Sequence, residues 1–133
     1  MTPVRGVMPH EVDGVFPTIV HFLEGGEQYG AGRWTMAELQ QSIKEGRRQL
    51  WISDDPLCAL VTQIDNYPAA KVLNIFWAGG KLPEDCNDIL DAIEAWGVRK
   101  GCTQSEVGGR KGWARKLRGY RPAPWSVLIK DLA

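Results

Sequence analysis

A pair of glycines stands where an apolar, strand-prone run gives way to a helical pattern. The stretch Trp77-Ala78-Gly79-Gly80-Lys81 combines backbone freedom with one positive charge. Glycine lets a backbone approach a ligand closely, and backbone N–H groups ahead of a helix bind anions well. One hypothesis is therefore that Trp77, Ala78, Gly79, Gly80 and Lys81 bind the phosphates of a cofactor. The alternative is a plain turn between a strand and a helix.

The residues after the glycine pair bear on this choice. Pro83 has no N–H to donate, and Glu84, Asp85 and Asp88 place three carboxylates in or near the first turn of the predicted helix. A unit charge about 4 Å from a like charge costs roughly 1–4 kcal/mol near a protein surface. The acids therefore favour the plain turn over a phosphate site.

Charged residues are unevenly distributed along a neutral chain. The 133 residues include 16 Lys and Arg and 16 Asp and Glu, so the formal net charge is zero. Residues 99–121 hold eight of the bases and one acid, Glu106. Zero net charge excludes a global attraction to nucleic acid or membrane. The local excess of bases is typical of either an anion site or a solvated helix face.

The cysteine and histidine patterns argue against a metal site. Cys58, Cys86 and Cys102 lie in or beside apolar segments, at spacings unlike those of metal ligands. His10 and His21 have no acidic partner at ligand spacing. Because the sequence shows no signal-like segment and no apolar run of membrane length, we expect a soluble, cytoplasmic protein with small buried thiols.

Hydrophobic periodicity divides the chain into helices and strands. Apolar stripes at three- and four-residue spacing predict three helices, and a basic run predicts a fourth; these cover residues 11–22, 35–46, 83–100 and 112–118. Short β-prone runs bounded by polar turns predict five strands, over residues 49–53, 57–64, 70–77, 102–107 and 125–129. Residues 1–10 should form an extended lead-in or a first edge strand.

These elements combine into one domain, residues 1–133, of the α+β class. The run 49–77 should form an antiparallel meander, because its turns are short. The strand after the crossover helix 83–100 should pair in parallel with the strand before it. We therefore expect a mixed, mostly antiparallel central sheet with helices on both faces.

The element order resembles the GNAT superfamily of acyl-CoA-dependent N-acyltransferases over residues 11–132. Four pieces carry the likeness: the meander 49–77, the step 77–83, the strand 102–107, and the segment GRKGWARKLRGY at 109–120. Gly119-Tyr120 stands where that family commonly has a Gly-Phe-like dipeptide before its last strand. The "GR-x-GW" segment is also similar to a small, divergent GNAT-like group encoded by tailed phages.

The resemblance implies a GNAT-like N-acyltransferase that moves an acetyl or acyl group from acetyl-CoA to an amine. Residues 77–81 would then meet the coenzyme phosphates, although the family's usual phosphate motif is absent. Glu106 is the candidate catalytic base, because it is the one acid within the basic region. Arg115 stands where the family often has its tyrosine, and Tyr120 stands at the Phe position.

Two other functions stay open. The chain could be a catalytically inactive GNAT-fold protein, such as a phage virion or assembly protein that binds a protein partner in the host cytoplasm or the virion. Residues 99–121 could instead bind nucleic acid, although no recognised motif supports this. Glu106 could also form a surface ion pair with Arg110 or Lys111.

Overall fold

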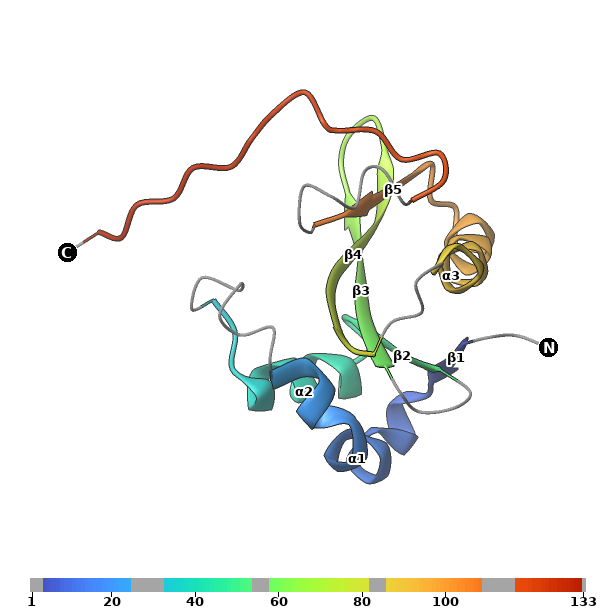
Figure 1. Ribbon diagram of the computed structural model, residues 1–133, viewed down its shortest axis with the longest axis vertical. Helices are drawn as coiled ribbons and strands as arrows, with labels where there is room; N and C mark the ends of the chain where they lie inside the picture. The colour runs from blue at the N-terminus through green and yellow to red at the C-terminus, as the bar shows by residue number, and fades with distance from the viewer. Residues whose placement is uncertain (1–3, 25–32, 54–57, 82–85, 109–116, 133) are drawn as a thin grey trace.

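A five-stranded sheet organises the protein. The computed structural model describes residues 4–24, 33–53, 58–81, 86–108 and 117–132. The strands lie across the sheet in the order in which they occur along the chain (Figure 1). They are β1 (Val4–Val7), β2 (Gln49–Ser53), β3 (Cys58–Asn66), β4 (Lys71–Gly80) and β5 (Gln104–Val107).

Helices pack on both faces of this sheet. The 3-10 turn η1 (Pro9–Glu11) leads into α1 (Val12–Glu24), which lies with α2 (Met36–Lys44) on one face, here called the α1/α2 face. The helix α3 (Asn87–Arg99) lies on the other, the α3 face (Figure 1). The expected α+β class is confirmed. Within the described ranges, no helix is long and apolar enough to cross a membrane.

Strand pairing follows the order expected from the sequence. β2–β3 and β3–β4 are antiparallel, as their short connections require. The lead-in supplies the edge strand β1, which is also antiparallel to β2 although α1 and α2 lie between the two in the chain. β4 and β5 are parallel, because the crossover through α3 returns the chain to the same end of the sheet.

Two apolar clusters, one on each face, hold the layers together, and each buried aliphatic side chain contributes roughly 1.5–3 kcal/mol. The buried residues of the α1/α2 cluster are Val7, Val12, Phe16, Ile19, Leu23, Leu39, Ile43, Leu50, Ile52, Ala59, Val61 and Trp77. Those of the α3 cluster are Val4, Trp51, Cys58, Leu60, Leu73, Ile75, Ile89, Leu90, Ile93 and Leu117. Both faces of the sheet are therefore apolar where helices cover them.

The first residues of α2 and α3 differ in how they are capped. Thr35 caps α2, because its Oγ1 accepts a hydrogen bond from the Glu38 N–H at 3.1 Å. Among the described residues, α3 begins at Asn87, with Cys86 before it, and its first buried residue is Ile89. The start predicted at Pro83 lies outside the described residues.

The glycine pair belongs to β4 and not to a turn after it. The predicted strand end at residue 77 is wrong, because β3 pairs with β4 as far as Gly80. A Cβ atom on Gly79 would overlap the carbonyl oxygen of Phe22 in α1. Gly79 therefore allows the end of α1 to lie directly on β4, while Gly80 has a φ of 91° that favours glycine.

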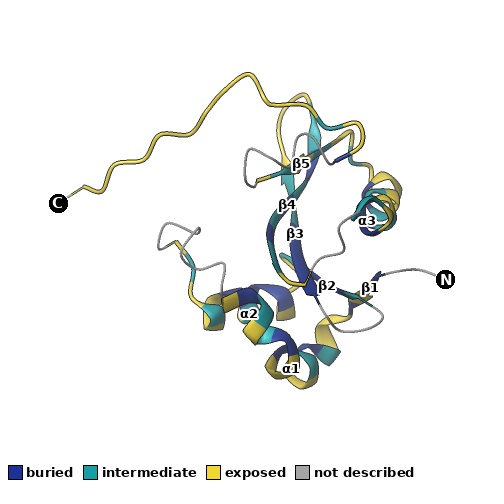
Figure 2. Ribbon diagram, viewed as in Figure 1, coloured by how far each residue is buried: buried dark blue, intermediate teal, exposed yellow. Residues whose placement is uncertain are grey.

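The last strand predicted over residues 125–129 is wrong for this chain. Residues 121–132 form neither helix nor strand and are exposed throughout (Figure 2). An apolar run becomes a strand only where a neighbouring edge accepts its backbone hydrogen bonds, and here the segment leaves the sheet. The predicted basic helix 112–118 falls mostly outside the described residues.

Substitution of Gly79 by alanine should destabilise the fold by about 1–3 kcal/mol, because the new methyl group must displace the α1 backbone. The matched control is Gly14→Ala in α1, where an added Cβ meets nothing within 4 Å. That control should stabilise the protein by roughly 0.5–1 kcal/mol. Urea denaturation of both variants measures the difference, and equal stabilities would contradict the packing role of Gly79.

Candidate functional site

β4 and β5 separate part-way along β4. Their parallel pairing joins residues 72–75 to residues 104–107 and ends at Ile75 and Val107. β4 continues to Gly80 while it remains paired with β3 on its other side. From residue 76 onward, no described strand pairs with the side of β4 that faced β5. We call residues 76–80 the open edge of β4. Such an edge can bind an extended ligand as an added strand.

A β-bulge lies where the two strands part. Val61 pairs with Trp77, but the next residue, Thr62, pairs with Ile75, so Phe76 is an extra residue in β4. A bulge bends its strand and increases its twist. The bulge at Phe76 thus accounts for the change in the course of β4 at the end of its pairing with β5.

Glu106, the predicted base, lies at the start of the open edge. It precedes Val107, the last paired residue of β5, and stands opposite Asn74 of β4. Its neighbours Ser105 and Val107 both contact groups on the α3 face. Because side chains alternate along a strand, Glu106 projects from the α1/α2 face, where it is exposed. A carboxylate in this position can accept a proton from a ligand at the open edge.

A row of hydrogen-bonded polar side chains leads across the same face toward Glu106. Arg48 Nε donates to Gln63 Oε1 at 3.0 Å, and Gln63 Nε2 donates to Asp65 Oδ1 at 2.9 Å. Asn74 Nδ2 donates to the other oxygen of Asp65 at 3.1 Å. We call Arg48, Gln63, Asp65 and Asn74 the polar row. It ends beside Glu106, the strand partner of Asn74.

Aromatic rings hold the other end of the polar row. The Arg48 guanidinium lies 4.0 Å from the centroid of Trp34 and 5.6 Å from that of Phe76. Burial lowers the pKa of Arg48, Arg47 adds to this effect, and Asp65 opposes it. The ring of Phe76, the bulge residue, thus contacts the cation that begins the row.

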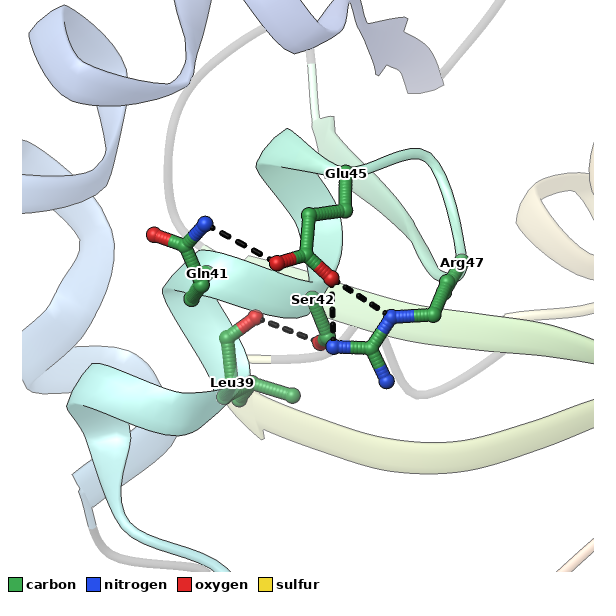
Figure 3. Close-up of polar contacts among 5 residues, drawn as sticks. All are labelled: Leu39, Gln41, Ser42, Glu45 and Arg47. Atoms are coloured by element: carbon green, nitrogen blue, oxygen red, sulfur yellow. Dashed lines mark hydrogen bonds and ion pairs between the residues drawn. The ribbon is translucent and has the colours of Figure 1, made fainter.

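The turn before β2 places Arg48. Glu45 accepts hydrogen bonds from Gln41 at 3.0 Å and from Arg47 at 2.7 Å (Figure 3). These two donors, Gln41 first, lower the pKa of the Glu45 carboxyl. Gly46 has a φ of 78°, so the chain can reverse between α2 and β2. This reversal sends Arg47 outward to Glu45 and the next side chain, Arg48, toward the sheet.

Comparison with known proteins identifies the fold. No family model matches the sequence, and no curated protein matches it. An aminoglycoside acetyltransferase, meta-AAC0020, from an uncultured soil metagenomic sample superposes with a TM-score of 0.71 and 10% identity, over 98% of this chain and 95% of that one. Ribosomal-protein-alanine N-acetyltransferase from Brucella melitensis biovar Abortus 2308 gives 0.66 and 7%, over 97% and 99%. This chain has the GNAT fold.

Of the five residues predicted to bind coenzyme, the first four end β4 and Lys81 follows the strand. The Trp77 side chain is buried, and its Nε1 donates to the carbonyl oxygen of Leu23 at 3.0 Å. Ala78 packs against the α3 cluster, and the space beside Gly79 is filled by α1. Gly80 and Lys81 are exposed. The small size of Gly79 is therefore explained by helix packing, with no need for a phosphate.

Tyr120 lies on the opposite face of the sheet from Glu106. Its hydroxyl donates to Glu94 Oε2 at 3.0 Å and lies 2.7 Å from Ser105 Oγ. Burial raises the pKa of the Tyr120 phenol, and the nearby carboxylates add to this rise. Tyr120 therefore joins α3, β5 and the start of the C-terminal segment, and it takes no part in the open edge of β4.

The described residues also bear on metal binding, on the cysteines and on the proposed ion pair of Glu106. No group of three or more His, Cys, Asp or Glu residues there could hold a metal ion. Cys58, Cys86 and Cys102 are free thiols, and burial raises the pKa of Cys58. Arg110 and Lys111, the proposed ion-pair partners of Glu106, lie outside the described residues, as does Arg115.

The polar row was not predicted from the sequence. Neither Gln63 nor Asp65 was among the predicted site residues, and the two stand two residues apart at the end of β3. Such spacing puts both side chains on one face of a strand, and the change from apolar to polar residues along β3 was the available signal. Nothing local indicated that Arg48, fifteen residues earlier than Gln63, would join them.

Replacement of Tyr120 by phenylalanine should lower the free energy of unfolding by about 1 kcal/mol near neutral pH, because a part-buried hydrogen-bond pair is lost. An unfolded tyrosine ionises near pH 10, and the folded pKa of Tyr120 is higher. Its contribution is therefore complete below about pH 10 and is lost as pH rises through the folded pKa.

Urea denaturation across this alkaline range checks the sign. The wild type should lose stability more steeply with rising pH than Tyr120→Phe does. Tyr67→Phe is the control, because the Tyr67 side chain is exposed. Identical pH slopes for wild type and Tyr120→Phe would contradict the assignment.

Proposed function

We propose that this GNAT-fold protein transfers an acyl group from acyl-CoA to an amine. The observation that carries the proposal is the open edge of β4, which begins at the bulge residue Phe76 with Glu106 beside it. The fold likeness to named acetyltransferases supports the same reaction class. Zero net charge and the absence of a recognised motif argue against nucleic acid as the principal ligand.

The described residues fit the extended part of the coenzyme better than its phosphates. The open edge of β4 offers backbone groups to an amide-bearing arm, and bound acyl-CoA would supply an acyl group activated as a thioester. The phosphates of the coenzyme would have to lie beside Gly79 and the start of α3. The space beside Gly79 is filled by α1, and the carboxylate of Asp88 in the first turn of α3 would repel them. The backbone groups of the open edge, residues 76–80, therefore support the proposed site, whereas a phosphate-binding role for Gly79 and Gly80 has no such support.

Glu106 has the position of a base that takes a proton from the acceptor amine. It is exposed, so the carboxylate is accessible, and it stands on the face opposite Tyr120. Asn74 lies next to it in the sheet and is held by Asp65, so the polar row would orient groups near the acceptor. The two named acetyltransferases act on unlike amines by their names, so the proposal extends to an amine and no further.

Replacement of Glu106 by glutamine should lower the acyl-transfer rate roughly 10²–10⁴-fold, because general-base catalysis contributes that much. Affinity for acetyl-CoA should stay unchanged, since the carboxylate is assigned to the acceptor. Release of free thiol from acetyl-CoA, followed with a panel of primary amines, measures the rate. Asp91→Asn, an exposed position on α3, is the control that should retain full activity. Full activity in Glu106→Gln would overturn the role of Glu106.

Titration calorimetry with acetyl-CoA tests the proposal before any acceptor is known. We expect saturable binding at micromolar protein, and coenzyme A without the acyl group should compete. If millimolar acetyl-CoA produces no heat of binding, the acyltransferase proposal fails. The catalytically inactive GNAT-fold protein, binding a protein partner, would then be the better reading.

A further inference from the structure

Arg48 is a partly buried cation with an unused hydrogen-bond donor. Its Nε donates to Gln63, but among the described residues the Nη1 of Arg48 is the one buried side-chain nitrogen or oxygen that has no hydrogen-bond partner. None of the ion pairs found in the described ranges includes Arg48, and Asp65 is linked to it through the Gln63 side chain. Because a charged donor that is buried without an acceptor is costly, Nη1 is suited to an acceptor that a ligand supplies.

Two aromatic rings lie against this guanidinium. Its central carbon is 4.0 Å from the centroid of Trp34 and 5.6 Å from that of Phe76, and both rings are only partly buried. Phe76 is fixed in the sheet as the bulge residue of β4, whereas Trp34 precedes the N-cap of α2 and belongs to no helix or strand. A ligand oxygen that reaches Nη1 would therefore displace the Trp34 ring and leave Phe76 in place.

The guanidinium lies on the α1/α2 face, on the same side of the sheet as the proposed base. Phe76 is the first residue of the open edge of β4, so the guanidinium lies beside the start of that edge. Neighbouring strands are about 4.8 Å apart, so the guanidinium, which reaches Phe76 of β4, and the Glu106 carboxyl of β5 are separated by one or two strand spacings, roughly 5–10 Å. One small molecule with two polar ends can span this separation.

We infer that the acceptor amine carries a carboxylate, which Arg48 binds; this inference rests on the proposed acyl transfer. The amine nitrogen bonds to the acyl carbon and gives its proton to Glu106, while the thioester C–S bond breaks and the thiolate takes a proton from water. A carboxylate matches the guanidinium, because its oxygens accept charge-assisted hydrogen bonds in the plane of the N–H donors. Asp65 and Glu106 on the same face would repel a more highly charged anion such as a phosphate. The acceptors are therefore amino acids and related amines with one carboxylate.

Nuclear magnetic resonance tests the carboxylate site without coenzyme. The Arg48 Nε–H signal, identified by its loss in Arg48→Met, should shift saturably with at least one of glycine, γ-aminobutyrate and ε-aminohexanoate. It should stay in place with the amines of the same chain lengths that lack the carboxylate. Arg48→Met should keep the fold, because an unbranched apolar side chain can pack between the two rings. The absence of a shift with all three amino acids would overturn the inference and assign Nη1 to the Trp34 ring alone.

The rate of thiol release from acetyl-CoA gives a second readout. The wild type should show a kcat/KM roughly tenfold or more higher for the preferred amino acid than for its matched amine, since a hydrogen bond to a charged group contributes that much. Arg48→Met should lose this preference, whereas Arg47→Met, an exposed neighbour paired with Glu45, should keep it.

A preference that survives in Arg48→Met contradicts the role of Arg48. The two proposals fail in different ways. If acetyl-CoA does not bind in calorimetry, the proposed acyl transfer fails, and the resonance titration still decides whether Arg48 binds a carboxylate. If acetyl-CoA binds and amines are acylated with no preference for a carboxylate, only the inference about Arg48 is overturned.

Discussion

β4 must stay rigid on one side while it loses its neighbour on the other, and the proposed site depends on that constraint. Unpaired backbone groups are costly unless water or a ligand reaches them, so an open edge persists only if the rest of the strand is held firmly. β3 holds β4 as far as Gly80, and the Trp77 indole bonds to the Leu23 carbonyl at the end of α1. Gly79 lets that helix approach closely enough for this bond to form.

The polar row is the second consequence of this arrangement. The part of the α1/α2 face that the apolar cluster does not cover carries the amides and the carboxylate of the polar row. Polar groups that are partly buried need hydrogen-bond partners to be stable. Asp65 accepts from both Gln63 and Asn74, while Arg48 stacks on Trp34 and bonds to Gln63. This network fixes the side chains around the start of the open edge and leaves Glu106 exposed to solvent.

The two faces of the sheet carry different groups of functional interest. The α1/α2 face carries Glu106 and the polar row, whereas the α3 face binds the start of the C-terminal segment through Leu117 and Tyr120. The proposed proton transfer and the contacts of Tyr120 therefore lie on different sides of β5. Ser105 and Glu106 are adjacent on this four-residue strand, so the alternation of side chains places one on each face.

The sequence by itself determined the class of fold. Turn residues and apolar spacing act within a few residues, so the meander, the crossover helix, the Thr35 cap and the parallel pairing could all be predicted from it. Only the tertiary structure decided the role of Gly79, the joining of Arg48 to Asp65, and the exposure of residues 121–132. Each of these depends on atoms brought together from distant parts of the chain. Local propensity cannot specify such contacts, because the neighbour that completes them is chosen by packing.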